Sequence, residues 1–292
     1  MQTVLQRGAV IMTALFSMIL VSGCEKASKQ NSEPAAVSTA APPAEKEDIQ
    51  PEADEEPAVE LSKTAPHELL IIAEEALDEN RVDRTLEAIR ELRGREKMSV
   101  VMKMHVARVL FGAGAMKESA AVYDEVLEQS PGIKPQLWQR GLALYYAEEF
   151  KKGVDQFDTH QFYNSQDVEN SVWHLLCKAR LTSVDKARES MIQIEDDSRI
   201  PMKEVFEMFA GKGSPEQVIA ATGFDEQNIV RNGSIYHGWL YVGLFHEMMG
   251  DQKAANEAMK TALKCKPIIP GLMGHVAEGH LRVRGAYSEV AE

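Results

Sequence analysis

Three groups of residues have types and spacings that could support chemistry. His174 lies three residues before Cys177, which on a helix places an imidazole and a thiol on one face, as in a thiolate–imidazolium pair. The stretch Gly211-Lys212-Gly213-Ser214 is similar to a phosphate-binding loop. His275 and His280 offer two side chains of a type that binds metals.

None of the three patterns is complete. A phosphate loop needs an earlier glycine and a Ser or Thr directly after the lysine, but Gly213 follows Lys212. His275 and His280 are five residues apart and point to different faces of a helix. Helix packing explains His174 and Cys177 more simply than catalysis does. We therefore expect no catalytic residue, no metal and no cofactor, with a hydrolase that uses Cys177 and His174 as the alternative.

The elements that hold these residues repeat every 34 positions. Trp239-x2-Val242-Gly243, then Ala255-x3-Met259 and Pro267, follow the tetratricopeptide repeat (TPR) pattern of two helices and a closing proline. The same pattern recurs in phase, centred on Gly141, Ala107 and Ala73. Small residues recur where the first helix approaches its partner, and bulky residues recur where the second helix fills the contact.

The repeat predicts an all-α fold, a TPR-type helical hairpin solenoid over residues 66–292. The phase places two further units near Leu175 and Phe209, the latter interrupted by a glycine-rich loop. A last helix over residues 272–284 is predicted to cap the stack, with Arg282 and Arg284 on its polar outer face. Scaffolds of this kind bind other proteins and rarely catalyse reactions, so the period predicts a non-enzymatic protein.

Two cysteines lie within the predicted repeats. The phase puts Cys177 and Cys265 about two units apart, and packed helices are about 10 Å apart, which is beyond disulfide reach. The sequence therefore predicts two free, buried thiols.

The N-terminal residues have the features of an export signal. Arg7 precedes an apolar run over residues 9–20, which is too short to span a membrane and typical of a signal peptide. Val21-Ser22-Gly23-Cys24 resembles the lipobox of bacterial lipoproteins, in which cleavage precedes the cysteine and its thiol carries lipid. The resemblance implies a signal peptide over residues 1–23 and a covalent lipid, including palmitate, on Cys24. Glu25 is not the Asp that retains such proteins in the inner membrane, which implies the outer membrane, facing the periplasm.

Residues 24–65 differ in composition from the rest of the chain. Ala, Pro, Glu, Asp and Ser dominate, and large apolar residues are almost absent, so this segment is predicted to be a disordered acidic tether. The chain has 45 acidic and 32 basic residues and a formal net charge of −13. Such a balance disfavours nucleic acid and anionic lipid surfaces as partners.

The repeat phase also predicts a binding groove. Residues of the first helices that do not face the stack line the concave side, and aromatic and Arg side chains are common anchors of protein interfaces. Burial in the core is the competing interpretation for the aromatic residues, and it is favoured for Tyr145. The predicted protein-binding residues are Met104, Arg108, Phe111, Trp138, Leu142, Tyr145, Tyr146 and Arg180.

Three segments carry a family resemblance. Leu137–Tyr146, Ser171–Leu176 and Tyr241–Asp251 resemble, in order, helices of the TPR lipoproteins typified by NlpI, and the similarity covers residues 131–267. A group of plant-type TPR proteins of undefined role shares much of this stretch. The resemblance implies an envelope adaptor that forms homodimers and docks C-terminal-processing proteases or peptidoglycan hydrolases. The long acidic tether and the irregular first unit depart from that family.

Two functions remain open from the sequence. The first is a non-catalytic lipoprotein adaptor whose groove binds envelope proteins. The second is a structural assembly factor of an envelope or membrane complex, which makes only constitutive contacts.

Overall fold

The computed structural model describes residues 60–95 and 97–287. The predicted signal peptide, Cys24 and residues 24–59 of the predicted tether lie outside the described residues. Residues 60–65, also part of the predicted tether, are described and contain a short 3-10 turn, Leu61–Lys63. Leu61 is buried against the helical core, and the guanidinium of Arg95 donates to the carbonyl oxygens of Leu61 and Thr64.

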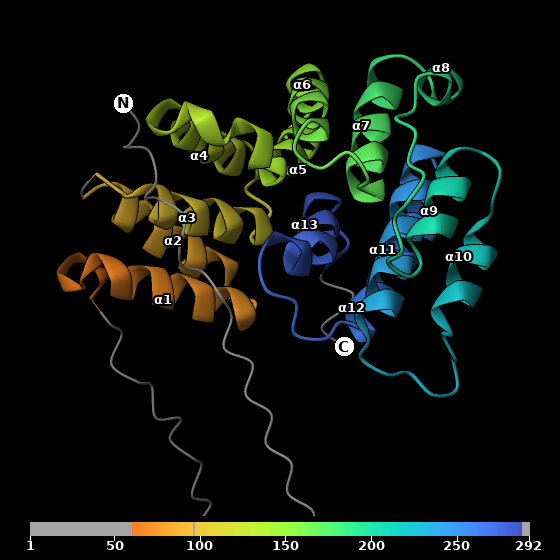
Figure 1. The fold of residues 1–292 in the computed structure, drawn as a ribbon. Helices are drawn as coiled ribbons and strands as arrows, with labels where there is room; N and C mark the ends of the chain where they lie inside the picture. The colour runs from red at the N-terminus through yellow and green to blue at the C-terminus, as the bar shows by residue number, and fades with distance from the viewer. Residues whose placement is uncertain (1–59, 96, 288–292) are drawn as a thin grey trace, which may run out of the picture. The chain divides into compact units, whose positions relative to one another are not determined.

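The described residues are helical and contain no β-strand. Short turns join most consecutive helices, and longer connections precede α9, α11 and α13 (Figure 1). The helices are α1 Pro66–Asp78, α2 Val82–Arg93, α3 Val100–Gly112, α4 Met116–Gln129, α5 Trp138–Tyr146, α6 Phe150–Gln161, α7 Val168–Leu181, α8 Val184–Glu189, α9 Met202–Phe209, α10 Pro215–Thr222, α11 Gly233–Met248, α12 Gln252–Lys264 and α13 Val276–Val283. Two further 3-10 turns cover Pro131–Gln136 and Leu272–His275.

The helices pack as consecutive hairpins in the predicted register. α1 packs on α2, α3 on α4, α5 on α6, α7 on α8, α9 on α10 and α11 on α12. The six predicted repeat centres, spaced by 34 residues, all fall in the first helix of a hairpin. The fold is therefore an all-α, TPR-type helical solenoid, as the sequence predicts.

Glycines set the close approach inside two hairpins. A Cβ added at Gly141 of α5 would lie 2.6 Å from Cε1 of Phe157 on α6. A Cβ added at Gly243 of α11 would lie 2.9 Å from the terminal methyl of Met259 on α12. Both pairs are 16 residues apart, so the small-to-large pairing in the sequence corresponds to one repeated contact in the fold.

The fourth and fifth hairpins are shorter than the others. α8 has 6 residues, and α9 and α10 have 8 each. The glycine-rich loop that interrupts the pattern near Phe209 is the turn between α9 and α10, and Ser214 and Gln217 form a capping box there. Residues 190–201, between α8 and α9, have no helical structure.

The last helix does not simply cap the stack. α13 packs against α12 and also against α3, and Figure 1 shows it in the middle of the helical hairpins, with α3 on one side and α11 on the other. Val276, Ala277, His280 and Leu281 are each fully buried. A Cβ added at Gly279 would lie 2.8 Å from the carbonyl oxygen of Phe111, so only glycine permits this approach to α3.

The predicted polar outer face of the last helix was wrong. Arg282 donates to the carbonyl oxygen of Gly112 and, at 2.9 Å, to Oδ1 of Asn80. Arg284 donates to a carboxylate oxygen of Glu247. Both arginines thus hold α13 against earlier helices, because the helix lies inside the repeats and its charges need internal partners.

A buried polar cluster joins α5, α11 and α13. The Glu247 side chain is only 3% exposed, and its carboxylate accepts from Arg284 and, at 3.4 Å, from Tyr145 Oη. Nδ1 of His280 lies 3.1 Å from Oε2 of Glu247 and 3.1 Å from Oη of Tyr146. Burial lowers the pKa of His280 to about 4, although the Glu247 carboxylate acts in the opposite direction. His280 is therefore neutral at pH 7.

Replacing Gly141 should destabilise the fold. Gly141→Leu is expected to lower the free energy of unfolding by about 3 kcal/mol, because the side chain overpacks the contact with Phe157. Gly233→Ala, where an added Cβ has no neighbour within 4 Å, should be close to neutral. Urea unfolding followed by circular dichroism checks both, and wild-type stability of Gly141→Leu would mean that the register is wrong.

His280 should make the fold sensitive to acid. Between about pH 6.5 and pH 4 the unfolded chain binds a proton at this residue, whereas the folded chain does not. The contribution of His280 to the free energy of unfolding is therefore fully present above pH 6.5 and is lost toward pH 4. The loss from this group should be about 3 kcal/mol. His280→Gln should lack this part of the pH dependence in urea unfolding. His174, whose pKa burial also lowers, stays in both proteins and serves as the shared background.

Candidate functional site

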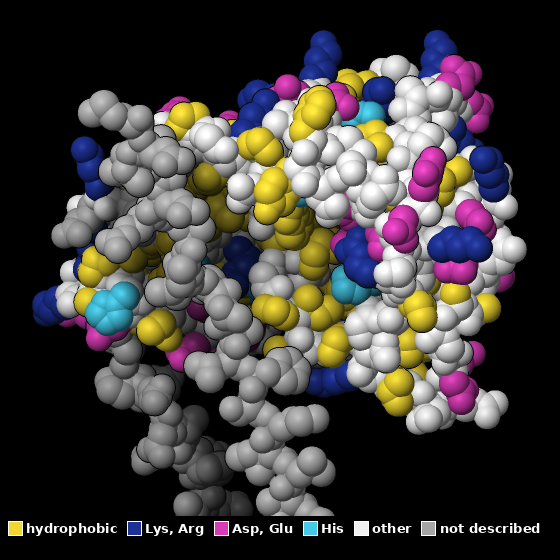
Figure 2. All heavy atoms as spheres, viewed as in Figure 1, with side chains coloured by type: hydrophobic (Ala, Val, Ile, Leu, Met, Phe, Trp, Pro, Cys, Tyr) yellow, Lys and Arg dark blue, Asp and Glu magenta, His cyan; other side chains and the backbone are white. Residues whose placement is uncertain are grey.

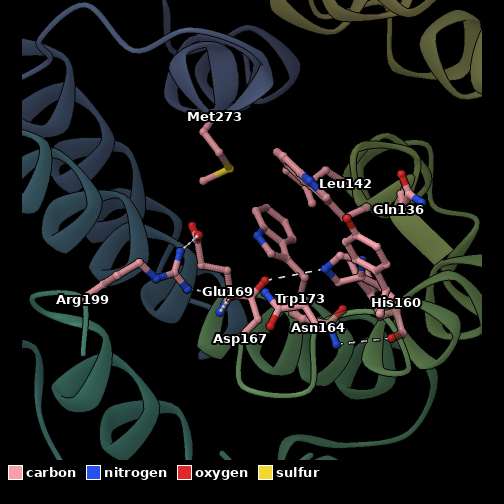
Figure 3. Close-up of a pocket in the computed structure, with 13 residues that line it drawn as sticks. Gln136, Leu142, His160, Asn164, Asp167, Glu169, Trp173, Arg199 and Met273 are labelled. Atoms are coloured by element: carbon pink, nitrogen blue, oxygen red, sulfur yellow. Dashed lines mark hydrogen bonds and ion pairs between the residues drawn. The ribbon is translucent and has the colours of Figure 1, made fainter. Parts of the chain in front are cut away.

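A cavity of about 450 Å³ lies among the third and fourth hairpins and the C-terminal segment. Figure 3 shows Trp173 in its centre, Arg199 on one side, Leu142 on the other, and Met273 reaching in from the C-terminal segment. The lining residues are Gln136, Trp138, Leu142, Phe157, His160, Tyr163, Asn164, Asp167, Glu169, Asn170, Trp173, Arg199 and Met273.

The polar side of the cavity is built at the start of α7. Asp167 is the N-cap of this helix, and its Oδ1 accepts from the backbone N–H of Glu169 at 3.1 Å. Capping fixes the carboxylate beside the helix and directs Glu169 and Trp173, four residues apart, along one face. Oε1 of Glu169 accepts from Oη of Tyr241 on α11 at 2.6 Å. The position of the acidic side chains thus depends on two hairpins.

One arginine holds three carboxylates beside the cavity. Nη2 of Arg199 donates to Asp167 at 2.7 Å and to Asp197 at 2.6 Å, and Nη1 donates to Glu169 at 2.6 Å. Burial alone would raise the pKa of Asp197, but the hydrogen bond and charge of Arg199 outweigh burial and lower it. Three carboxylates against one guanidinium leave two negative charges uncompensated by Arg199.

His160 completes this charged edge. Its Nε2 lies 3.7 Å from Oδ2 of Asp167, and its Nδ1 lies 2.7 Å from the carbonyl oxygen of Pro135, to which it donates. Burial lowers the pKa of His160, but its contacts with Asp167 and Pro135 outweigh burial, so the pKa is raised. A neighbouring carboxylate therefore favours the charged imidazolium here, unlike at His280.

Aromatic side chains form the other side of the cavity. Trp138 begins α5 and is half-buried, whereas Trp173 of α7 is buried with its ring 5.5 Å from that of Tyr145. Tyr163, which follows α6, is 60% exposed, and the adjacent Phe162 is 91% exposed. Ile200, next to Arg199, is also 60% exposed. Tyr163 therefore joins the cavity to the exposed surface, and Phe162 and Ile200 are exposed chain neighbours of lining residues.

Four of the predicted groove residues do not line an open groove. Phe111, Leu142, Tyr145 and Tyr146 are at most 5% exposed. Tyr146 packs edge-on against His280 with ring centroids 5.8 Å apart, and Tyr145 donates to Glu247. α13 covers Phe111 and Tyr146, whereas Tyr145 is enclosed by Trp173 and Glu247. Burial in the core, the interpretation favoured for Tyr145, holds for all four.

The other four predicted residues lie in three places. Trp138 lines the 450 Å³ cavity, together with the buried Leu142. Met104 and Arg108 line a smaller cavity of about 140 Å³ beside Leu272, where Arg108 is paired with Glu74. Arg180 lies 3.9 Å from Glu247 and stacks on the ring of Phe150 at 5.3 Å from its centroid. Figure 2, in the same view as Figure 1, shows hydrophobic side chains gathered around a hollow on the face turned toward the viewer.

Sequence reasoning missed most of the charged residues of the cavity. Asp167 could have been found as a helix N-cap before the apolar run of α7, but capping alone does not indicate a site. Arg199 lies in an irregular connection 32 residues after Asp167, and Met273 lies in another. No local pattern places either of them beside α7.

Cys177 and His174, the residues considered for catalysis, do not have the environment of a reactive thiol and its base. Cys177 and Cys265 are free and buried, as predicted. Burial raises the pKa of the Cys177 thiol, which therefore stays protonated, whereas nucleophilic cysteines are thiolates. His174 Nε2 lies 3.0 Å from Oδ1 of Asp158. Within residues 60–95 and 97–287, no group of three His, Cys, Asp or Glu side chains is placed to hold a metal ion.

The part of the chain that the structure describes has no helix with the length and apolar character needed to cross a membrane. The longest described helix, α11, has 16 residues.

Similarity to known proteins was found among solved structures. No protein-family model and no curated protein matches the sequence. MamA residues 41 to the end, from Desulfovibrio magneticus RS-1, is 13% identical, with 68% of this chain and 94% of that chain covered and a TM-score of 0.37. TTC0263, a thermophilic TPR protein of Thermus thermophilus, is 14% identical over 78% of this chain and 99% of that chain, with a TM-score of 0.37.

A TPR protein from Parabacteroides merdae ATCC 43184 is 13% identical, with 77% of this chain and 89% of that chain covered and a TM-score of 0.37. The helix order and the 34-residue register of this chain are those of a TPR-type fold.

Removing the arginine should destabilise the charged edge in a pH-dependent way. Arg199→Ala is expected to cost about 1–3 kcal/mol at pH 7, because three neighbouring carboxylates lose their shared partner. The cost should be smaller at pH 3, because Asp167 and Asp197, whose pKa values Arg199 lowers, begin to bind protons there and the ion pairs are lost. Arg81→Ala, which removes an exposed pair with Glu79, should change stability by less than about 0.5 kcal/mol. Urea unfolding at both pH values checks this, and equal costs for the two variants would contradict it.

Proposed function

We propose that this chain is a non-catalytic adaptor that binds other proteins of the bacterial cell envelope through the inner face of its helical hairpins. The inner face is the side on which α13 and the two cavities lie. The observation that carries the proposal is the cavity lined by Trp138 and by Tyr163, which is 60% exposed, with the 91% exposed Phe162 next to Tyr163 in the chain. Large exposed apolar side chains beside a cavity are a feature of protein-binding surfaces.

The location follows from the N-terminal sequence. A lipid on Cys24 would anchor the chain to the periplasmic face of the outer membrane, and residues 24–59 would separate the anchor from the helical hairpins. The resemblance to TPR lipoproteins supports a protease of the C-terminal-processing class or a peptidoglycan hydrolase as the partner. It also supports a homodimer.

The surface for this binding differs from the groove that the sequence predicts. The α13 helix lies against Phe111 and Tyr146, and Tyr145 donates to Glu247 of α11, so these residues support the fold from inside. Trp138, Met104 and Arg108 retain partial exposure and border the two cavities on the inner face. The proposal therefore uses Trp138, rather than Tyr146, as the residue to change.

Capture from envelope membranes tests the proposal. The full-length lipidated chain should recover a periplasmic protease or a peptidoglycan hydrolase, and Trp138→Ala should reduce that recovery about tenfold, as expected for an interface anchor. Met249→Ala removes a side chain that is 52% exposed at the end of α11 and is the matched control. The bait itself should fractionate with the outer membrane.

A different set of captured proteins would favour a different function. Stoichiometric recovery of the subunits of one membrane complex, equal for wild type and Trp138→Ala, would contradict the adaptor proposal. That outcome would support the structural assembly factor instead.

A further inference from the structure

We propose that the cavity around Trp173 binds a basic side chain, Lys or Arg, of a protein partner. The inference rests on the proposed function, because it names the chemistry of the partner at the same surface. Four features of the cavity support it: its charge, its aromatic walls, a free acceptor and its apolar border.

The charge of the cavity suits a cation. Asp167 and Glu169 line it with side chains that are 15% and 18% exposed, and Asp197 is paired with the same Arg199. Arg199 and the protonated His160, which also line the cavity, bring two positive charges against these three carboxylates, so one negative charge remains in excess. Arg199 and Tyr241 hold these carboxylates from the side, so their orientation is fixed before a ligand arrives. A carboxylate has about four acceptor positions, so each retains capacity for another donor. Preorganised acceptors with excess negative charge favour an ammonium or guanidinium group.

The walls of the cavity suit the same group. Trp138, Tyr163 and Trp173 line it, and the faces of aromatic rings attract cations within about 6 Å of their centroids. A basic side chain also has an apolar stem, which Leu142 and Met273 could contact. The volume of about 450 Å³ is within the range of ligand cavities, which begins near 300 Å³.

A buried acceptor in the cavity lining lacks a donor. Asn170 is 3% exposed, and its Nδ2 donates to the carbonyl oxygen of Phe157 at 3.3 Å and to Oε1 of Gln161 at 3.0 Å. Its Oδ1 has no hydrogen-bond partner among the described residues. Buried polar atoms are normally paired, so this free acceptor suits a ligand that donates hydrogen bonds. Nε1 of Trp173, a buried donor that also lines the cavity, lacks a partner as well.

The border of the cavity favours a protein over a free amine. Tyr163, which lines the cavity, is 60% exposed. Two apolar residues next to lining residues in the chain are also exposed, Phe162 by 91% and Ile200 by 60%. A small amine would leave these side chains in water, whereas a segment that carries the basic residue would cover them. The apolar border therefore indicates a partner chain as the source of the cation.

Blocked peptides test the inference on the full-length lipidated chain in detergent micelles. The probes are acetyl-Leu-Ala-X-Ala-Leu-amide with Arg, Lys or the neutral Arg analogue citrulline at X. Binding is followed by tryptophan fluorescence. The Arg and Lys peptides should bind at least about fivefold more tightly than the citrulline peptide, because only they carry the charge. The preference should weaken as salt is raised.

Variants assign the binding to this cavity. Asp167→Asn with Glu169→Gln should reduce the affinity for the Arg peptide about tenfold and abolish the preference over citrulline, and Asn retains the N-cap of α7. Asp185→Asn with Glu189→Gln makes the same change of charge on the exposed α8 and should have no effect. Trp138→Leu, which leaves every charge in place, should also weaken binding of the Arg peptide.

Three outcomes would overturn the inference. One is equal binding of the Arg and citrulline peptides, or no binding of either. Another is a Trp138→Leu variant that is folded and binds the Arg peptide as wild type does. The third is binding of putrescine as tight as that of the Arg peptide, which would identify a free amine as the ligand.

Different results would contradict the proposed function and this inference. Suppose that Trp138→Ala loses the captured enzyme while Asp167→Asn with Glu169→Gln retains it fully. That result would support the adaptor function and contradict the binding of a basic side chain. If the Arg peptide binds with the expected charge preference and no protease or hydrolase is captured, the cavity binds a basic side chain but the adaptor proposal is contradicted.

Discussion

The buried carboxylate of Glu247 is the constraint on which the arrangement of the described helices depends. An unpaired charge at this depth would cost several kcal/mol, so α11 is stable only if partners surround it. Arg284, the C-cap of α13, supplies the ion pair, Tyr145 of α5 supplies a hydrogen bond, and Arg180 of α7 lies at 3.9 Å. One side chain therefore links four helices that are far apart in the sequence, and it holds α13 on the inner face.

The placement of α13 changes what the inner face can do. A solenoid with an open inner face exposes the first helix of every hairpin, but here α13 contacts α3 and covers Phe111 and Tyr146. The aromatic residues in the middle of that face are therefore structural. The cavities that remain lie beside the C-terminal segment, with Leu272 at one and Met273 at the other. The same segment thus fills the groove and shapes the sites that are left.

The irregular fourth and fifth hairpins have a corresponding consequence for the cavity. Because α8 is only 6 residues long, the chain leaves the helical pattern at residue 190 and runs back past the start of α7. Val168 N–H donates to Asp197 of this connection at 3.1 Å. Arg199 then reaches the N-cap of α7, Asp167, and Glu169 in its first turn. A regular 34-residue unit would have placed a second helix here and left no arginine beside the cavity.

The sequence by itself determined the helical register, because the contacts that define a hairpin are local. Gly141 meets Phe157 and Gly243 meets Met259 at the same separation of 16 residues, so a period of 34 identifies both helices and their contact. The sequence could not determine which face stays open. That depended on contacts such as Tyr146 with His280, 134 residues apart, and Asp167 with Arg199, 32 residues apart across an irregular connection. No periodic pattern encodes such pairs, because they form only when buried charges and apolar surface find partners in the packed chain.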